Sequence, residues 1–336
     1  MNFFILTCIF FITIVLIFFL KKYANLFSLV DIPNERSMHT NIIPRGAGIA
    51  FVLSIFISLI MFDISYLKTY YYIYLAITIV WIVGILDDIK DISPKIKFIF
   101  IFFAMLILYA NDFVIHSLGT YFGYEIIIPN WLIFFFSFFA LTGYTNALNL
   151  MDGLDGLAAS ITIVMLVTFL GIGLQYHDEL LISLSSFFIV SLVAFLFFNW
   201  NPATIFMGDS GSLTLGTVIV ILTIQAVQYI TPASVLFIIA LPLLDTFIVM
   251  IRRKQRGRPL FEADKNHLHH FLYNLKGDIR FTVIVLIVMQ TIFSIIGFQV
   301  QYANDLLSVI LFLLLFYIYL NLFDQRLKRR KKKKKN

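Results

Sequence analysis

The chain has 336 residues, of which 60% are hydrophobic, 17% aromatic and only 13% charged, with a mean hydropathy of +0.93. An ordinary soluble domain has about 25% charged residues. This composition therefore excludes a soluble globular protein and predicts a polytopic membrane protein, whose length counts membrane spans rather than soluble domains. The single cysteine, Cys8, lies in the first apolar segment, which excludes an internal disulfide and a cysteine-rich metal site.

Apolar segments recur along almost the whole chain, and we interpret eleven of them as transmembrane helices by the rule of about 20 apolar residues per span. Their ranges are 3–20, 46–62, 70–86, 97–110, 131–145, 157–175, 180–198, 212–229, 232–251, 281–299 and 305–323. The sequence thus predicts an all-α membrane protein. Residues 1–323 would form a single integral-membrane domain, and residues 324–336 a basic tail that is disordered by composition.

The basic residues predict the orientation of the chain. No basic residue precedes the first segment, and Lys21 and Lys22 follow it, which is the reverse of a cleaved signal peptide. We therefore expect a permanent first span with the N-terminus outside. In this orientation 24 of the 25 lysines and arginines fall inside, and only Lys68 falls outside. The C-terminus would then be cytoplasmic, and the acidic motifs described next would share a cytoplasmic face.

A polar stretch, residues 146–158, interrupts the apolar pattern. Asn146, Asn149, Asp152 and Asp155 recur there every three residues, which on a helix gives one slowly drifting ridge of oxygen ligands. Ionised carboxylates at the edge of a bilayer are costly unless they are paired, so they indicate a functional site. Such a ridge suits a hard cation, or a phosphate-bearing substrate held through one. The alternative is a helix end capped by aspartate and asparagine.

A second acidic group closes the third segment. The spacing of Asp87, Asp88 and Asp91 lets all three face one side of a short helix. Like charges this close are unfavourable unless a divalent cation or a lysine compensates for them. The pattern favours metal-assisted phosphoryl chemistry, and the alternative is a helix end that forms salt bridges with Lys90 and Lys95.

Asp209 lies between two glycines, just before a helix that we expect to begin at about Ser212. A helix N-terminus offers free N–H groups and partial positive charge, which bind phosphate. Asp209 beside it is placed to carry a metal that bridges to that phosphate. Simple capping of the helix by Asp209 and Ser210 is the alternative, and it is compatible with the first role.

Two inside loops carry the remaining candidates. Residues 21–48 are rich in proline, glycine and alternating charge, so they predict an ordered turn that either binds phosphate or is simply hydrated. In residues 252–280, arginines suit the diphosphate of a nucleotide, and three histidines suit proton transfer or phosphate binding. Because the inside surface is rich in oxygen ligands, it favours magnesium or manganese over zinc.

Asp245 lies within the ninth segment, after Pro242. Its ionised form is costly at that depth, so we expect it to face the interior of the bundle. It would serve either helix packing or support of the site.

Taken together, these motifs resemble the polyprenyl-phosphate N-acetylhexosamine-1-phosphate transferases. The motifs are Asp87-Asp88-Ile-Lys-Asp91, residues 146–158, Phe206-Met-Gly-Asp209-Ser-Gly-Ser and His267-Leu-His-His270. The earlier stretches Asp31-Ile-Pro-Asn-Glu-Arg-Ser-Met-His and Ile43-Pro-Arg-Gly-Ala-Gly resemble the WecA-type branch, which starts O-antigen, capsule or teichoic-linkage chains. Leu268 within the histidine motif is a normal family variant, and Ala47 replaces a common glycine.

The resemblance implies a UDP-N-acetylhexosamine donor and an undecaprenyl phosphate acceptor, with UMP and a polyprenyl diphosphate sugar as products. It implies a multi-pass enzyme of the bacterial cytoplasmic membrane that uses Mg²⁺ or Mn²⁺ and binds no nucleic acid. A homodimer is left open. The identity of the sugar, the glycan pathway, and the choice between one step and a covalent phosphoenzyme are open as well.

The resemblance also implies residue roles. Catalysis is assigned to Asp87, Asp88, Asp91, His267, His269 and His270, with Asp87 or Asp88 deprotonating the acceptor phosphate. The metal is assigned to Asp209 and Asp88. Substrate binding is assigned to Asp31, Arg36, His39, Arg45, Asn146, Asn149, Asp152, Asp155, Arg252, Arg253 and Arg258.

Two alternatives stand beside this interpretation. The first is the peptidoglycan branch of the same family, whose donor carries a pentapeptide on muramic acid; the first inside loop and residues 252–258 argue against it. The second is a cation-coupled transporter that uses Asp245. Such a transporter would place acids near mid-bilayer on several helices and often contains an internal repeat, whereas here the acids gather at the inner edge.

Overall fold

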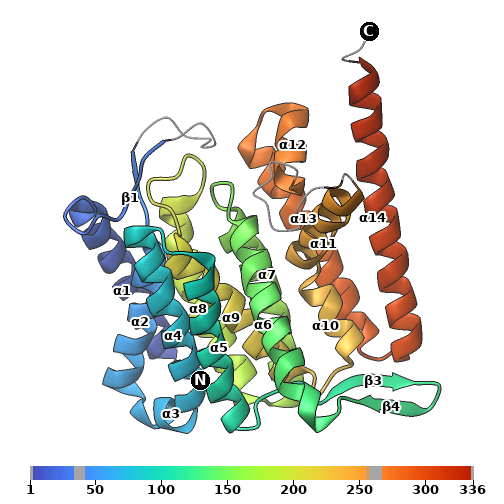
Figure 1. Ribbon diagram of the computed structural model, residues 1–336. Helices are drawn as coiled ribbons and strands as arrows, with labels where there is room; N and C mark the ends of the chain where they lie inside the picture. Colours follow the sequence, from blue (N-terminus) through green and yellow to red (C-terminus); the bar gives the residue numbers. More distant parts are fainter. Residues whose placement is uncertain (1–2, 34–41, 256, 258–266, 334–336) are drawn as a thin grey trace.

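The computed structural model describes the chain apart from residues 1–2, 34–41, 256, 258–266 and 334–336. Long helices stand side by side in a bundle (Figure 1). The first seven helices are α1 (Phe3–Tyr23), α2 (Ala47–Phe62), α3 (Ile64–Thr69), α4 (Tyr71–Lys90), α5 (Pro94–Ala110), α6 (Asn130–Met151) and α7 (Leu157–Tyr176). The others are α8 (Glu179–Asn199), α9 (Asp209–Ala226), α10 (Pro232–Ile238), α11 (Ala240–Gln255), α12 (Leu268–Lys276), α13 (Ile279–Val300) and α14 (Asp305–Lys333).

Two small antiparallel sheets accompany the helices. Strands β1 (Val30–Asp31) and β2 (Ile43–Pro44) pair in the loop between α1 and α2. Strands β3 (Ser117–Tyr121) and β4 (Tyr124–Ile127) form a hairpin between α5 and α6. In Figure 1 the hairpin projects sideways from the lower end of the bundle, and β1 lies at the upper end. We call the upper end, where α4 ends and α9 begins, the site end, and the lower one the hairpin end.

The all-α membrane fold is confirmed. In the described part of the chain, seven helices are long and apolar enough to cross a membrane, or eight if the bent pair α10–α11 forms one span. Two shorter apolar helices, α2 and the first part of α14, fall below that length. Every predicted apolar segment coincides with a helix or, for residues 232–251, with a broken pair.

The prediction of one continuous helix over residues 232–251 is wrong, because α10 and α11 meet at an angle of 84°. Pro242 lies in the first turn of α11 and has no N–H to donate. Gln290 of α13, which is fully buried, bridges the break: its Nε2 donates to the carbonyl of Ile238 at 2.7 Å, and its Oε1 accepts from the N–H of Leu241 at 3.2 Å. A break within a bundle is stable when such partners satisfy the freed backbone groups.

Helix α9 is the most buried of the seven helices, with 89% of its apolar window inside the structure. Glycines let its neighbours approach it closely. A Cβ on Gly48 of α2 would lie 2.1 Å from the backbone nitrogen of Gly211, and one on Gly84 of α4 would lie 2.5 Å from the Cα of Ser210. Small residues at helix contacts allow this approach in membrane proteins. As a result, the first turn of α9, which carries Asp209, lies against the ends of α2 and α4.

Candidate active site

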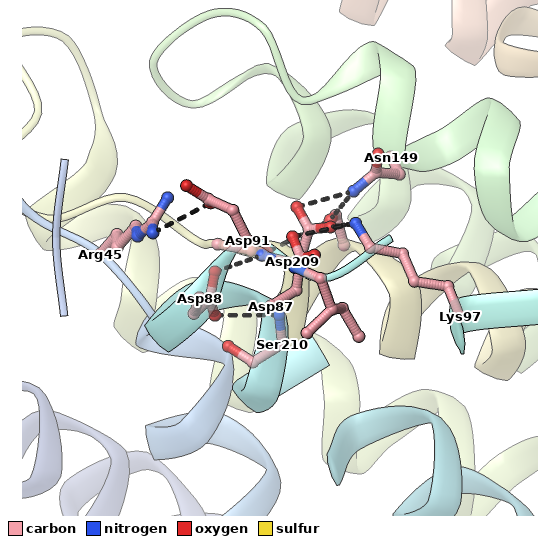
Figure 2. A network of polar contacts seen from close by, with 11 residues as sticks. Arg45, Asp87, Asp88, Asp91, Lys97, Asn149, Asp209 and Ser210 are labelled. Carbon is pink, nitrogen blue, oxygen red and sulfur yellow. Dashed lines mark hydrogen bonds and ion pairs between the residues drawn. The ribbon is translucent and has the colours of Figure 1, made fainter. Parts of the chain in front are cut away.

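Asp88 joins the end of α4 to the start of α9. It is buried, and its two carboxylate oxygens accept the backbone N–H groups of Asp209 at 2.8 Å and Ser210 at 3.0 Å (Figure 2). A negative charge is favourable at a helix N-terminus, where free N–H groups carry partial positive charge. A Cβ on Gly208 would lie 2.5 Å from both oxygens, so only glycine fits there. Asp88 thereby fixes the position of Asp209.

Asp87 and Asp209 meet at one ammonium group. Lys97, in the first turn of α5, lies 2.9 Å from Oδ2 of Asp87 and also forms an ion pair with Oδ2 of Asp209 (Figure 2). All three side chains are largely buried, with exposed fractions of 13 to 25%. Asn149 of α6 donates from Nδ2 to Oδ1 of Asp209 at 3.1 Å and to Oγ of Ser212 at 2.8 Å. Residues of α4, α5, α6 and α9 thus form one charged cluster, which consists of Asp87, Lys97, Asn149 and Asp209.

The prediction that Asp91 shares a face with Asp87 and Asp88 is wrong. Helix α4 ends at Lys90, and Asp91 takes a left-handed conformation with φ 45°. Its side chain is 84% exposed and lies 3.4 Å from the guanidinium of Arg45. The carboxylate therefore points away from Lys97, as Figure 2 shows.

The prediction of one helical ridge through residues 146–155 is also wrong. Helix α6 ends at Met151, and α7 begins after Gly156, whose φ is 75°. Asn146 is exposed and donates to the carbonyl of Thr142 in its own helix at 2.8 Å. Of the four predicted residues, only Asn149 contacts the cluster through a hydrogen bond within the described residues. The helix stops one turn too early for the ridge to form.

The two aspartates of the loop between α6 and α7 have different surroundings. Asp155 accepts from Nδ2 of Asn201 at 2.8 Å and from the N–H of Ala203 at 3.0 Å, so it holds the loop before α9 in place. Burial, and then the charges of Asp209, Asp88 and Asp155, raise the pKa of Asp152 to about 7. Asp152 therefore changes charge near neutral pH, while Asp155 braces the loop.

The histidine motif packs against the same loop. His267 and His269 are buried, and their rings stack with centroids 5.8 Å apart. A Cβ on Gly153 would lie 2.5 Å from Nε2 of His269, so the motif reaches the residue next to Asp152. Burial, followed by the charge of the neighbouring His270, lowers the pKa of His269 to about 3. His269 is therefore neutral at physiological pH.

The remaining predicted residues are more distant or lie outside the described residues. Arg252 and Arg253 are buried in the last turns of α11. Asp31 lies in β1, opposite Ile43 of β2. The described residues do not include Arg36, His39 or Arg258. Among the described contacts, the Arg45 side chain pairs with Asp91, which lies outside the charged cluster.

Lys97 is the important residue that the sequence did not single out. Its signal was its position, because it follows the aspartate pair at the start of the next apolar segment. A lysine there satisfies the positive-inside rule equally well. Only the fold shows that the start of α5 returns to the aspartates.

The residues of the cluster fit a magnesium ion. Among the described residues, no group of three or more histidine, cysteine, aspartate or glutamate side chains is arranged to hold a metal. Magnesium, however, is usually bound through one or two carboxylates, with water and substrate phosphates completing its shell. Asp87 and Asp209, which already share one cation, supply two such carboxylates.

Comparison with known proteins identifies the family of the chain. The model of glycosyl transferase family 4 matches residues 70–227. A probable undecaprenyl-phosphate N-acetylglucosaminyl 1-phosphate transferase of Bacillus subtilis is 31% identical over 89% of this chain and 85% of its own length. Undecaprenyl-phosphate alpha-N-acetylglucosaminyl 1-phosphate transferases of Salmonella typhi and Escherichia coli K12 are 29% and 28% identical, each over 94% of this chain and 89% of their own length. The chain therefore belongs to glycosyl transferase family 4, together with these polyprenyl-phosphate sugar 1-phosphate transferases.

Proposed function

We propose that the protein transfers N-acetylhexosamine 1-phosphate from a UDP-sugar to undecaprenyl phosphate, with N-acetylglucosamine as the sugar. The names of its relatives support the acceptor and the sugar. The observation that carries the proposal is the meeting of Asp87, Asp209 and Lys97 at the N-terminus of α9. Opposite charges held at one point are what a reaction between two phosphates requires. The first N–H groups of α9 do not serve as the phosphate site, because Asp88 and the carbonyl of Gly208 accept them.

In the reaction, an oxygen of the acceptor phosphate bonds to the phosphorus that carries the sugar. The bond from this phosphorus to the bridging oxygen of the diphosphate breaks, and UMP leaves with that oxygen. Because both reactants are anions, positioning and charge neutralisation dominate the barrier. Lys97 supplies a fixed positive charge at this point, and Asn149 and Lys97 orient Asp209.

We assign the metal to Asp209 and Asp87 rather than to Asp209 and Asp88. Both oxygens of Asp88 already accept backbone N–H groups, whereas Asp87 and Asp209 share a cation. A magnesium ion bound there would neutralise phosphate charge and polarise the reacting phosphorus. Asp87 would also take the proton of the acceptor phosphate. Asp88 serves by fixing the start of α9.

The rest of the site would bind the donor. The buried Arg252 and Arg253 carry the charge and the forked geometry that suit a diphosphate. Asp152 and the histidine motif would line the nucleotide and sugar side, because they meet at Gly153.

We further propose that the site end faces the cytoplasm of a bacterial cell, with α2, α5, α14 and the α10–α11 pair completing eleven spans. The distribution of lysine and arginine supports this orientation. The diphosphate of a UDP-sugar is charged, so the donor does not cross a bilayer unaided. The site must therefore face the compartment that contains the donor, which in this proposal is the cytoplasm.

The test is UMP release by purified protein in detergent, supplied with undecaprenyl phosphate, Mg²⁺ and a panel of UDP-N-acetylhexosamines. We expect release with UDP-N-acetylglucosamine, loss of release on chelation of the metal, and a decrease of about 100- to 1,000-fold for Asp209→Asn. Asp178→Asn is the matched control, because Asp178 is also a buried carboxylate but lies at the hairpin end. Folded wild-type protein that releases no UMP from any donor would refute the proposal.

A further inference from the structure

Asp245 makes a two-point contact with the start of the histidine motif. The carboxylate is 3% exposed and the imidazole of His267 is 5% exposed. Oδ2 of Asp245 lies 2.7 Å from Nδ1 of His267, and Oδ1 accepts the backbone N–H of Leu268 at 2.7 Å. One side chain of α11 therefore holds both the ring of His267 and the first residue of α12.

This contact determines which ring nitrogen carries the proton. A carboxylate accepts hydrogen bonds, so Nδ1 of His267 must be the donor in the 2.7 Å contact. The other nitrogen, Nε2, is then the one left for a substrate or for proton transfer.

We propose that Asp245 is the positioning residue of the histidine motif: it keeps the proton on Nδ1 of His267, orients the ring, and presents Nε2 to the substrate. The catalytic part of this inference rests on the function proposed above. A buried carboxylate behind a working histidine fixes its tautomer and direction in this way.

The position of His267 bears on the rest of the site. Its ring stacks on that of His269 at an interplanar angle of 10°. Nε2 of His269 in turn lies against Gly153, next to Asp152. A rotation of the first imidazole would therefore disturb the second one and its contact with the loop between α6 and α7. Asp245 thus connects α11 with the aspartates of the site.

The alternative role of Asp245 is to cap α12 through the N–H of Leu268, and the test must separate the two roles. Asp245→Asn retains an oxygen for the N–H of Leu268 but presents an amide N–H to Nδ1 of His267. The variant therefore preserves the cap and reverses the tautomer. Asp178→Asn is again the control, since Asp178 likewise caps a helix, accepting the N–H of Leu181 at 2.7 Å, and lies far from the motif.

The first measurement is a double-mutant cycle on kcat for UMP release. We expect Asp245→Asn to lower kcat by about 10- to 100-fold, the usual cost of losing a residue behind a working histidine. KM for the UDP-sugar should change by less than about threefold, because Asp245 is 3% exposed and would not contact the donor. In a His267→Ala background the same substitution should change kcat by less than about twofold. Equal losses in both backgrounds, or no loss in either, would overturn the inference.

The second measurement does not depend on activity. Nitrogen-15 NMR of protein with labelled histidine reports which ring nitrogen carries hydrogen, and the signal of His267 is the one of six that disappears in His267→Gln. We expect hydrogen on Nδ1 in the wild type and on Nε2 alone in Asp245→Asn. An unprotonated Nδ1 in the wild type would refute the role of Asp245, even if every UDP-sugar failed and the proposed function were wrong.

Discussion

The carboxylates at the two ends of the bundle are satisfied in opposite ways. At the hairpin end, Asp178 accepts from the N–H of Leu181, Nε2 of Gln225 and the hydroxyl of Tyr229, at 2.6 to 2.8 Å. Asp305 accepts from the N–H of Thr120 at 2.7 Å. Neutral donors hold both carboxylates, and each belongs to a separate cap or contact.

At the site end, carboxylates gather instead of spreading out. Asp87 and Asp209 share Lys97, Asp88 caps the helix that Asp209 begins, and the charges of both Asp88 and Asp209 raise the pKa of Asp152. Like charges at this distance oppose folding unless cations join them. The hairpin end shows that the fold does not need such grouping to cap its helices. We therefore infer that the surplus of negative charge at the site end serves a functional site.

The largest effect is expected from removing the positive charge of Lys97, which joins the carboxylates at the site end. We expect Lys97→Gln to lower UMP release by about 100- to 1,000-fold, because the site loses the charge that stabilises the reacting phosphates. Lys95→Gln is the matched control: Lys95 lies two residues away in the same helix turn and is exposed. Steady-state kinetics with both variants checks the prediction. A Lys97→Gln enzyme with more than half of the wild-type rate would contradict it.

Most of the fold followed from the sequence, because the bilayer requires long apolar helices. The resemblance to polyprenyl-phosphate sugar transferases is confirmed by the comparisons. The break between α10 and α11 could not be predicted in the same way. Pro242 indicates that the helix is interrupted. The angle between α10 and α11, however, depends on the hydrogen bonds of Gln290, which lies nearly 50 residues further along the chain. Contacts between distant helices are invisible to local periodicity.

The site was predicted in part. The pairing of the aspartate motif of α4 with Asp209 was expected from the family pattern, and the structure brings them together. Asp91 and Asp155 do not join the cluster, because each prediction extended a helix past its real end. Asn146 lies within α6, but its side chain is exposed and donates to Thr142 of the same helix. Beyond the end of a helix, side chains no longer follow its 3.6-residue periodicity, so the helical pattern does not give their direction. Helix ends, where these residues lie, are thus the least predictable part of the site.

A smaller effect is expected from changing the packing between the histidine motif and the aspartates. In Gly153→Ala the new methyl group would lie 2.5 Å from Nε2 of His269, whose ring is buried and cannot swing away. We expect kcat to fall by about 10- to 100-fold, the cost of displacing reacting groups by about 1 Å.

Gly143→Ala is the control for this variant. A Cβ at Gly143, in α6, would meet nothing within 4 Å, so activity should be unchanged. Kinetics of the two variants side by side would decide the point. Equal activities would show that the histidine motif acts independently of the loop between α6 and α7.

The smallest effect concerns the free energy that the grouped charges cost. The pKa of Asp152 is about 7 in the folded protein and 3.8 in an unconstrained chain. Between these values the folded state binds more protons than the unfolded state, so stability falls as pH rises from about 4 to 7 and then levels off. Asp152→Asn should remove this decline and raise the apparent melting temperature by a few degrees at about pH 8, with a smaller gain at about pH 5.

Thermal unfolding in detergent, followed at both pH values without added metal, measures this difference. Asp91→Asn removes a carboxylate that is 84% exposed and serves as the control for losing one negative charge. A gain for Asp152→Asn that is equal at the two pH values would mean that the repulsion is not relieved by protonation. In that case the grouped carboxylates would cost the fold no more than the separate caps of the hairpin end, and the contrast between the two ends would lose its energetic basis.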